Sequence, residues 1–375
     1  MKEKIISQEE LQDKVVRTGL CTGCGACVGL CPYQVSYEDR MVFLNRCDLQ
    51  AGRCYALCPR TPTDLEALRI FLFDKADLTL EIGAVRGFYI TRAADSRIRE
   101  KAQHGGTVTA LMGLALEEGF IKEAILTEAG EDQLPRGVSV NEPGKVLGSA
   151  KSRFMVSPVL GLFNRLVSED HREIGIVATP CQALALAKMR FQPILENRVP
   201  IDRIQIVIGL FCGWALSWER LQQLLRKKTD KSVILGMDIL PSRYHTMEVY
   251  TPSGPVEISL DEVTPCVREA CWSCFDMTAE FSDISVGSAR LPEGWEEARK
   301  WNQVIVRTKE GADLLSLAIA KGILECRDVP EGNLDRLKKA AQEKKRTAVR
   351  NLSQRSGRRD DLIYLDSRDP ALQGL

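Results

Sequence analysis

The stretch CTGCGACVGLCP contains four cysteines, Cys21, Cys24, Cys27 and Cys31, and ends on a proline. Their spacing, C-x2-C-x2-C-x3-C-P, is typical of bacterial ferredoxins, in which three thiolates bind one iron–sulfur cubane and the fourth turns to another cluster. The small residues between the cysteines leave room for the inorganic sulfides. We therefore expect a 4Fe-4S cluster in this part of the chain.

Zinc and disulfides are the alternatives for so many clustered thiols. A zinc site predicts two CxxC pairs separated by a longer loop, or cysteines mixed with histidines. The chain has only three histidines, none of them near this stretch. Disulfides are rare in a reducing compartment. Iron is therefore the favoured interpretation.

A second run, CDLQAGRCYALCP, contains Cys47, Cys54 and Cys58. In a two-cluster arrangement Cys58 joins the first three cysteines of the preceding stretch, while Cys31 joins Cys47 and Cys54. The second cluster is then one thiolate short. It could be a 3Fe-4S cluster, a four-iron cluster with a ligand such as Asp48, or empty.

Two further cysteines follow probable buried strands. The segments Ile174 to Ala178 and Ile204 to Phe211 are short, continuous and rich in β-branched residues. If they are parallel neighbours, Cys181 and Cys212 lie together at the carboxyl edge of a sheet, where α/β proteins build sites. The stretch CVREACWSC adds two thiols at ligand spacing. The four that could enclose another cluster are Cys181, Cys212, Cys271 and Cys274.

Other roles are open for some of these thiols. Cys181 could be a core thiol or a nucleophile, but a nucleophile needs a base, and His171 lies in the polar stretch SEDHRE. Cys266 and Cys326 are interpreted as structural thiols. Cys266 could instead replace a neighbour or complete the deficient second cluster.

The sequence divides into three parts, residues 1–78, 79–330 and 331–375. The first is a ferredoxin-like module, the second a mixed-sheet α/β domain, and the third a charged helical tail. In the tail, apolar residues between Leu334 and Leu352 follow one side of a helix whose other side is rich in Lys and Arg. Such a helix usually has a solvated face, and it could alternatively dock a partner subunit.

A buried helix is expected from Thr107 to Leu116, entered through Gly105-Gly106. Two glycines before a helix N-terminus allow backbone amides to approach a phosphate, and Thr107 and Thr109 could add hydroxyl donors. Alone, the pattern favours an ordinary glycine turn.

Composition excludes several classes of protein. Lys plus Arg and Asp plus Glu both total 51, so the chain lacks the basic surplus that nucleic-acid binding requires. No apolar run is long enough to span a bilayer. The first residues, MKEKIISQEELQDK, contain no apolar signal region, so a cytoplasmic chain is expected.

Several stretches together resemble the beta subunits of coenzyme F420-reducing hydrogenases and dehydrogenases. These stretches are QHGGTVTALMGLALEEGFI, SAKSRFMVSP, ATPCQALALAK, GLFCGW, ACWSCFD and FSDISVGSARLPEGW. They cover roughly residues 85 to 350 in the family's order. With a ferredoxin module in front, the chain also resembles the beta subunits of F420-linked formate dehydrogenases.

The resemblance implies one FAD, one core 4Fe-4S cluster, and a site where a deazaflavin exchanges hydride with the flavin. Carried over by position, the cluster ligands are the same four thiols that the residue patterns selected, Cys181, Cys212, Cys271 and Cys274. The flavin would lie against Gly105, Gly106, Thr107, Thr109, Ser152, Arg153 and Ser157.

Two positions near the implied flavin depart from the family pattern. His104 stands where an acidic residue is common, and Arg153-Phe154 stands where a Lys-Tyr pair is common. His104 and Arg153 are therefore candidates for tuning the flavin, and Arg153 could stabilise its anionic reduced form. These departures leave open a hydride donor other than F420.

The hypothesis is a flavin- and iron–sulfur-dependent oxidoreductase subunit without a nucleophilic catalytic residue. It would exchange hydride with reduced F420 at FAD and pass single electrons, in either direction, through about two to three 4Fe-4S clusters. The partner would be a formate dehydrogenase, a hydrogenase or a heterodisulfide-reductase-type subunit. Alternatives are a ferredoxin-dependent FAD reductase of an organic substrate, an NAD(P)H- or ferredoxin-linked input subunit, and a flavin-free iron–sulfur wire.

Overall fold

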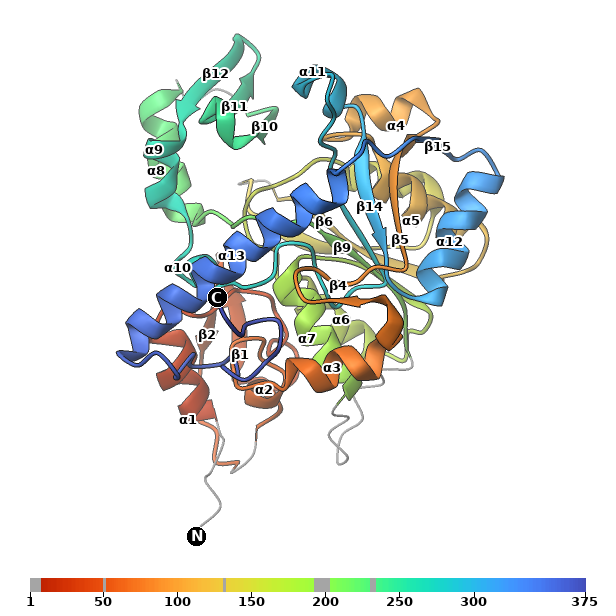
Figure 1. The fold of residues 1–375 in the computed structure, drawn as a ribbon. Coiled ribbons are helices and arrows are strands. Elements are labelled where there is room, and N and C mark those ends of the chain that lie inside the picture. The colour runs from red at the N-terminus through yellow and green to blue at the C-terminus, as the bar shows by residue number, and fades with distance from the viewer. Residues whose placement is uncertain (1–7, 50–51, 131–132, 192–202, 230–233) are drawn as a thin grey trace.

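An eight-stranded mixed sheet forms the centre of the computed structural model, which describes residues 8–49, 52–130, 133–191, 203–229 and 234–375 (Figure 1). In spatial order the strands are β15 (Leu324–Arg327), β5 (Gly87–Ala93), β14 (Asn302–Val306), β13 (Ile284–Ser288), β9 (Ile204–Leu210), β8 (Ile174–Ala178), β6 (Glu123–Ala129) and β7 (Pro135–Val140). The four inner strands β13, β9, β8 and β6 run parallel, and the others run antiparallel to their neighbours. The predicted mixed-sheet α/β class is confirmed.

The strands β8 and β9 are the two that the apolar runs predicted, and they are parallel neighbours with Ala178 opposite Gly209. Both are buried along most of their length because helices cover both faces of the sheet. The expected carboxyl edge, with Cys181 and Cys212 just beyond it, is therefore present.

Helices lie on both faces of the sheet. The helices α5 (Thr107–Glu117) and α12 (Lys309–Ala320) share one core with Ile206 and Ile208, while α6 (Val159–Ser168) and α7 (Pro180–Phe191) share another with Val207. This division follows from the alternation of side chains along β9. The predicted buried helix after the paired glycines is α5.

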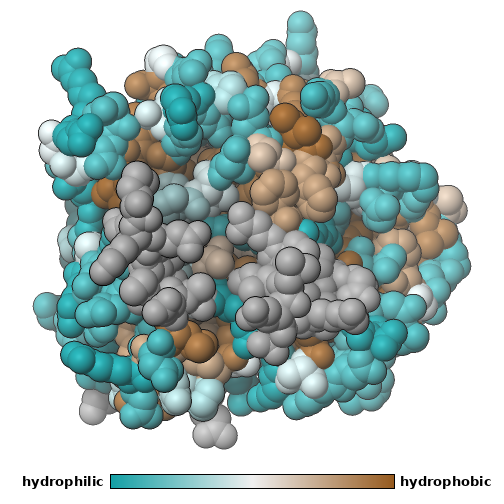
Figure 2. Space-filling model, turned by 90° about the horizontal axis from the view of Figure 1, so that it is seen from below, coloured by the Kyte–Doolittle hydropathy of each residue, from teal (hydrophilic) through white to brown (hydrophobic). Residues whose placement is uncertain are grey.

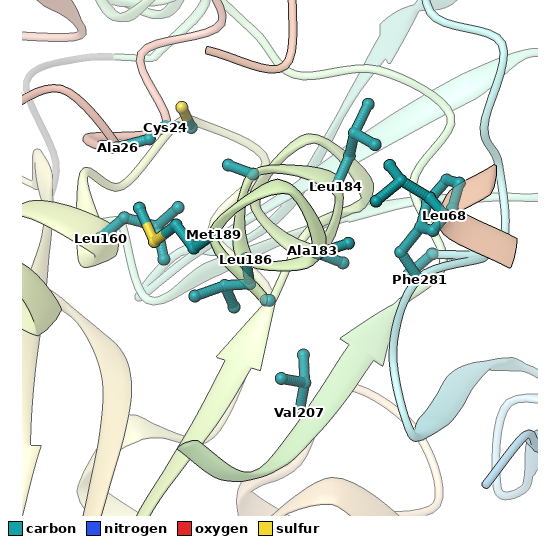
Figure 3. Close-up of a cluster of buried hydrophobic side chains, with 14 of the residues drawn as sticks. Cys24, Ala26, Leu68, Leu160, Ala183, Leu184, Leu186, Met189, Val207 and Phe281 are labelled. Carbon is teal, nitrogen blue, oxygen red and sulfur yellow. The ribbon is translucent and has the colours of Figure 1, made fainter. Parts of the chain in front are cut away.

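The ferredoxin-like module packs directly onto α6 and α7. It contains α1 (Gln8–Leu11), a π-helical turn (Gln12–Val16), the hairpin β1 (Gln34–Tyr37) and β2 (Arg40–Phe43), and α2 (Arg53–Ala56). Figure 3 shows Cys24 and Ala26 of this module in the same buried cluster as Leu160 of α6 and Met189 of α7. The module and the sheet therefore share one hydrophobic core.

A short connection leads from the module to the sheet. It consists of α3 (Leu65–Leu72), a 3-10 turn (Lys75–Asp77), β3 (Leu78–Thr79) and β4 (Gly83–Ala84). Asp64 caps α3, because its carboxylate accepts a hydrogen bond of 2.9 Å from the Ala67 amide. In Figure 3, Leu68 of α3 lies beside Phe281, so α3 also packs against the sheet domain.

A small lobe stands apart from the sheet (Figure 1). It lies within residues 79–330, for which the sequence predicts one α/β domain. It contains α8 (Trp218–Lys228), β10 (Gly236–Ile239), β11 (Thr246–Thr251), β12 (Gly254–Ser259) and α9 (Leu260–Val263). The three strands form an antiparallel sheet around Met247, Val249 and Ile258. The available sequence signal for it was the pattern TMEVYT of β11, in which Met247 and Val249 alternate with residues that are less buried in the structure.

The tail forms a long helix, α13 (Asn333–Ser356), that crosses the front of the molecule from the sheet to the ferredoxin-like module (Figure 1). The predicted apolar side is buried against this chain, with Ala348 and Leu352 fully enclosed. Tyr364 and Leu365 beyond it join the core between module and sheet. The apolar side of α13 is therefore occupied by the protein itself and is not free for a partner.

Outside the residues drawn in grey, the lower face of the molecule is mostly hydrophilic and carries several hydrophobic patches (Figure 2). Within the described residues, none of the helices combines the length and the apolar character needed to cross a bilayer.

Candidate functional site: three cysteine groups

The first group, the ferredoxin-type quartet, consists of Cys21, Cys24, Cys27 and Cys58. These four thiols line one hollow of about 350 Å³, part of it open to solvent, with Leu11, Val15 and Met41 as an apolar wall. The loop that carries three of them turns at Gly23 (φ +68°) and Gly25 (φ +85°). A Cβ on Gly25 would lie 2.6 Å from the Pro158 carbonyl oxygen, so this glycine brings the loop against α6.

Electrostatics show why this quartet fits a metal cluster. Burial raises the pKa of Cys24, and the charges of Cys181 and Cys58 raise it further. Burial raises the pKa of Cys58 to about 12 against the opposing effect of Lys188. Four thiolates in such a place repel one another unless cations neutralise them, which iron in a cluster does.

The second group, the outer trio, consists of Cys31, Cys47 and Cys54. Cys54 is buried in α2, and its pKa is raised by burial and by the charges of Cys31 and Cys47, which lie nearby. The structure therefore brings together the three thiols that the spacing assigned to one cluster. Asp48, the suggested fourth ligand, is exposed, and residues 50–51 beside it lie outside the described part of the chain.

A glutamine lies beside the outer trio that the sequence did not single out. Gln34 at the start of β1 is 3% exposed and hydrogen-bonds to the Cys54 side chain. Burial raises the pKa of the Cys54 thiol, and this hydrogen bond opposes that rise. Its Oε1 atom is buried and has no partner among the described residues. Gln34 lies only three positions after Cys31, but a glutamine by itself does not indicate a cluster site, so it was not among the predicted site residues.

The third group, the sheet-edge quartet, consists of Cys181, Cys212, Cys271 and Cys274. Cys181 opens α7 after β8, Cys212 follows β9, and the other two lie in and just after α10 (Glu269–Trp272). Burial raises the pKa of Cys212, and Lys344 of α13 opposes this while Cys271, Cys181 and Cys274 raise it further. The four thiols predicted to enclose a cluster therefore lie close together, and each is half-buried.

The zinc and disulfide alternatives concern the same cysteines. All thirteen cysteines are free thiols. In the described ranges, no three His, Cys, Asp or Glu side chains converge closely enough to hold a single metal ion. A zinc ion needs its thiolates about 2.3 Å from one point, whereas a cubane binds each thiolate through a different iron. Each quartet supplies the four thiolates that a cubane binds.

The two remaining cysteines lie elsewhere. Cys266 is buried in the core of the small lobe with Leu221 and Val263, which is the structural role expected of it. Its pKa is raised by burial, with Arg220 opposing the shift. Cys326 on the edge strand β15 is exposed, so the structural role expected for this thiol is wrong.

The paired glycines lie at the same edge of the sheet as the sheet-edge quartet. Gly105 packs so closely on β14 that a Cβ would lie 2.9 Å from the Asn302 side chain. Thr107 is fully buried: its amide donates to Asn302 Oδ1 (3.2 Å), and its hydroxyl pairs with that of Thr91. Thr109, two residues further along α5, is half-buried. Thr107 therefore already has protein partners at both polar groups.

The other implied flavin contacts divide between two places. Ser152 and Arg153 follow a 3-10 segment (Pro143–Ser149) and line a hollow of about 430 Å³ against α8 and β10. Burial lowers the pKa of Arg153, with Glu128 opposing the shift. Ser157 is buried instead beside α7, where its carbonyl accepts a 2.6 Å hydrogen bond from Gln182.

His104 lies in a basic and aromatic surrounding. Its ring meets Trp295 of α11 (Trp295–Ala298) edge-on, with centroids 5.6 Å apart. Burial, together with the charges of Arg290 and Arg299, lowers the pKa of His104 to about 4. The stretch SARLPEGW contains Arg290 and Trp295, but the sequence offered no pairing of these residues with His104, because long-range packing creates it.

Several polar atoms near this edge have no partner within the described chain. They are His104 Nδ1, Arg153 Nε, Ser157 Oγ and Trp295 Nε1, all buried. Buried polar atoms normally find hydrogen bonds, so unsatisfied atoms at the edge of an α/β sheet fit a bound polar ligand. The residues present are therefore compatible with a flavin nucleotide.

Fold and thiol groups together define an iron–sulfur oxidoreductase built from a ferredoxin-type module and an α/β domain. Residues 14–35 match the family described as 4Fe-4S binding domain. Residues 88–164 and 171–332 match the N-terminal and C-terminal parts of the coenzyme F420 hydrogenase/dehydrogenase beta subunit. The chain belongs to this family of beta subunits, as its motifs predicted.

Named relatives agree with this assignment. The chain is 31% identical to the coenzyme F420 hydrogenase subunit beta of Methanosarcina barkeri, over 69% of this chain and 89% of that protein. It is 28% identical to the protein of the same name in Methanothermobacter thermautotrophicus, over 73% and 96%. A chain of the F420-reducing [NiFe] hydrogenase complex of Methanosarcina barkeri superposes with a TM-score of 0.67 at 28% identity, covering 74% of this chain and 94% of that one.

Proposed function

We propose that this protein is the electron-input subunit of a redox complex, binding FAD at the sheet edge and iron–sulfur clusters at its cysteine groups. It exchanges hydride with a two-electron carrier, reduced coenzyme F420, and passes single electrons to a partner subunit. The partner is a hydrogenase, a formate dehydrogenase or a heterodisulfide-reductase-type protein. Electrons can flow in either direction.

The observation that carries this proposal is the continuous series of the three cysteine groups. Cys181 of the sheet-edge quartet raises the pKa of Cys24 in the ferredoxin-type quartet, after the larger effect of burial. Burial raises the pKa of Cys27, and its neighbours Cys24, Cys21, Cys58 and finally Cys54 of the outer trio raise it further. Cys181 packs against the buried hydrophobic cluster that contains Cys24, and Cys54 shares another such cluster with Cys27 and Cys58, so adjacent groups lie close together, as an electron-transfer chain requires.

The sheet edge offers the properties that a flavin and an anionic hydride carrier need. Bound flavin would supply exchange between two-electron and one-electron carriers. Arg153 places a positive charge at the hollow beside β10, which favours a negatively charged reduced cofactor. His104, with a pKa of about 4, is neutral at pH 7 and acts as a hydrogen-bonding group, while Arg290 and Arg299 beside it attract anions.

The names of the relatives support the choice of carrier and partner. Two curated relatives are subunits of coenzyme F420 hydrogenase, and a third, at 26% identity, belongs to the F(420)H(2) dehydrogenase of Methanosarcina mazei. That third relative aligns with 80% of this chain.

The test is anaerobic purification followed by cofactor analysis and donor screening. We expect released FAD at about one per chain, iron and sulfide, and rapid reduction of a viologen dye by reduced F420. NADH and reduced ferredoxin serve as competing donors. A colourless protein, zinc in place of iron, or a viologen that stays oxidised with reduced F420 would each contradict the proposal.

A matched pair of variants tests the anionic carrier. Arg290→Gln removes one charge beside His104 and should raise the KM for reduced F420 about tenfold with a smaller effect on kcat. Arg358→Gln, an exposed arginine just after α13, is the control and should leave both constants unchanged. Equal effects of the two substitutions would show that the basic residues beside His104 do not bind the carrier.

A second candidate donor is supported by His104 and Arg153, which depart from the residues common in the family. Reduction of the dye by NADH or ferredoxin, with no response to F420, would favour an NAD(P)H- or ferredoxin-linked input subunit. Turnover of an organic substrate by the isolated chain would favour a ferredoxin-dependent reductase.

A further inference from the structure

Arg60 connects the two cysteine quartets. It follows Cys58 by two positions, and its side chain is buried, with the residue only 4% exposed. One terminal nitrogen, Nη2, donates to the Ala270 carbonyl (3.2 Å), and the other, Nη1, donates to the Ser273 carbonyl (3.3 Å). These carbonyls immediately precede Cys271 and Cys274. One guanidinium from the module therefore hydrogen-bonds to the loop that carries two cysteines of the sheet-edge quartet.

Tyr364 completes this bridge from the far end of the chain. Its hydroxyl donates to the Ser273 carbonyl (2.6 Å) and accepts a hydrogen bond from Arg60 Nη1. The guanidinium also lies over the tyrosine ring, 4.7 Å from the centroid. Since Tyr364 is 1% exposed, the segment after α13 is buried where the two quartets meet.

Arg60 also carries a permanent positive charge into the space between the thiols. Its guanidinium interacts electrostatically with Cys274 and Cys181 of the sheet-edge quartet. Its backbone amide donates to Cys58 Sγ of the ferredoxin-type quartet (3.4 Å). A buried cation stabilises added negative charge, so it favours the reduced state of any cluster beside it.

We propose that Arg60, supported by Tyr364, is a positioning residue for electron transfer: it holds the two cysteine loops together and raises the reduction potentials of both clusters. This role rests on the cluster binding of the proposed function, but it requires neither flavin nor F420. It is specific to a chain in which a ferredoxin-type module is fused to the sheet domain.

Lys188 of α7 provides a matched control. It is also buried, 5% exposed, and it donates to the Cys58 carbonyl (2.7 Å) and the Thr61 hydroxyl (2.9 Å). Both acceptors belong to residues of the ferredoxin-like module. Its removal should therefore affect the ferredoxin-type cluster alone, whereas removal of Arg60 should affect both clusters.

The experiment compares the full-length protein with Arg60→Gln, Arg60→Lys, Tyr364→Phe and Lys188→Gln after anaerobic cluster loading. Mediated redox titrations followed by electron paramagnetic resonance give both potentials and the spin–spin interaction between the reduced clusters. We expect Arg60→Gln to disfavour reduction of both clusters about tenfold, equal to about 59 mV for one electron. Arg60→Lys should keep both potentials near their wild-type values, because lysine keeps the positive charge. It should still weaken the spin–spin interaction, because lysine lacks the two terminal nitrogens that donate to the Ala270 and Ser273 carbonyls.

Tyr364→Phe should weaken the spin–spin interaction with little change in either potential, and Lys188→Gln should lower only the potential of the ferredoxin-type cluster. Two unchanged potentials in an Arg60→Gln protein with wild-type iron content would overturn the proposal. If Arg60→Gln fails to hold iron, an unaltered spin–spin interaction in both Arg60→Lys and Tyr364→Phe would overturn it. Absence of clusters from the wild-type protein would instead refute the proposed function, because the titration uses no hydride donor.

Discussion

The ferredoxin-type quartet and the sheet-edge quartet each consist of four cysteines but are assembled differently. Three thiols of the first come from one tight loop that turns at glycines with positive φ. The second gathers its thiols from the ends of β8 and β9 and from the α10 region. The comparison shows that one set depends on local backbone geometry, whereas the other depends on the whole sheet being formed.

The largest effect is expected when one thiol is removed from each quartet. Cys24→Ser and Cys212→Ser should each lower the iron content by about four atoms per chain. Cys24→Ser should keep the signal of the sheet-edge cluster and its electron acceptance from the flavin. Cys212→Ser should keep the ferredoxin-type signal but lose transfer to it. Loss of both signals in either single variant would contradict separate clusters.

The next test breaks the buried ion network that joins the two regions. Lys345 of α13 pairs with Glu280, which also lies 3.4 Å from Arg69 of α3, and Arg69 contacts Asp369 at 2.9 Å. Lys345→Met leaves Glu280 without its closest partner and should lower the free energy of unfolding by about 3–5 kcal/mol. Chemical denaturation measures this. The exposed Lys339→Met should change stability by less than about 0.5 kcal/mol.

A glycine of the ferredoxin-type loop gives a smaller expected effect. Gly25→Ala combines a positive φ with a contact of 2.6 Å to the Pro158 carbonyl, and should cost about 2–4 kcal/mol. Gly119→Ala is the control, because it has a φ of +65° and open space, and should cost only about 1–2 kcal/mol. Thermal unfolding and iron retention measure both. Equal losses of stability in the two variants would contradict a role for the packing of Gly25 against α6.

The smallest effect concerns pH dependence at the sheet edge. The pKa of His104 falls to about 4 in the folded protein, below its ordinary value of about 6.5, so the unfolded chain binds the extra proton. Stability is therefore lost as the pH falls from 6.5 towards 4, by about 2 kcal/mol between pH 7 and pH 5. His104→Gln should flatten this slope, whereas His245→Gln, an exposed histidine, should not. An unchanged slope in His104→Gln would contradict a buried neutral ring.

Much of the fold could be predicted because its signals are local. The apolar runs predicted β8 and β9, the continuous apolar pattern predicted α5, and the periodicity of the tail predicted α13. The small lobe was missed, since its strands are short and lie inside a longer α/β pattern. Lys345 was also missed: the charge pattern predicts a solvated lysine, and only the partner Glu280 explains why it is buried.

By itself the sequence determined the iron–sulfur chemistry, because cysteine spacing limits which thiols can reach one cubane and the resemblance follows from the same short motifs. Only the tertiary structure decided how the cysteine groups are joined. Arg60, Tyr364 and His104 acquire their surroundings from segments up to 304 residues away, as the Arg60–Tyr364 pair shows. Such contacts depend on packing of the whole chain, and no local pattern encodes them.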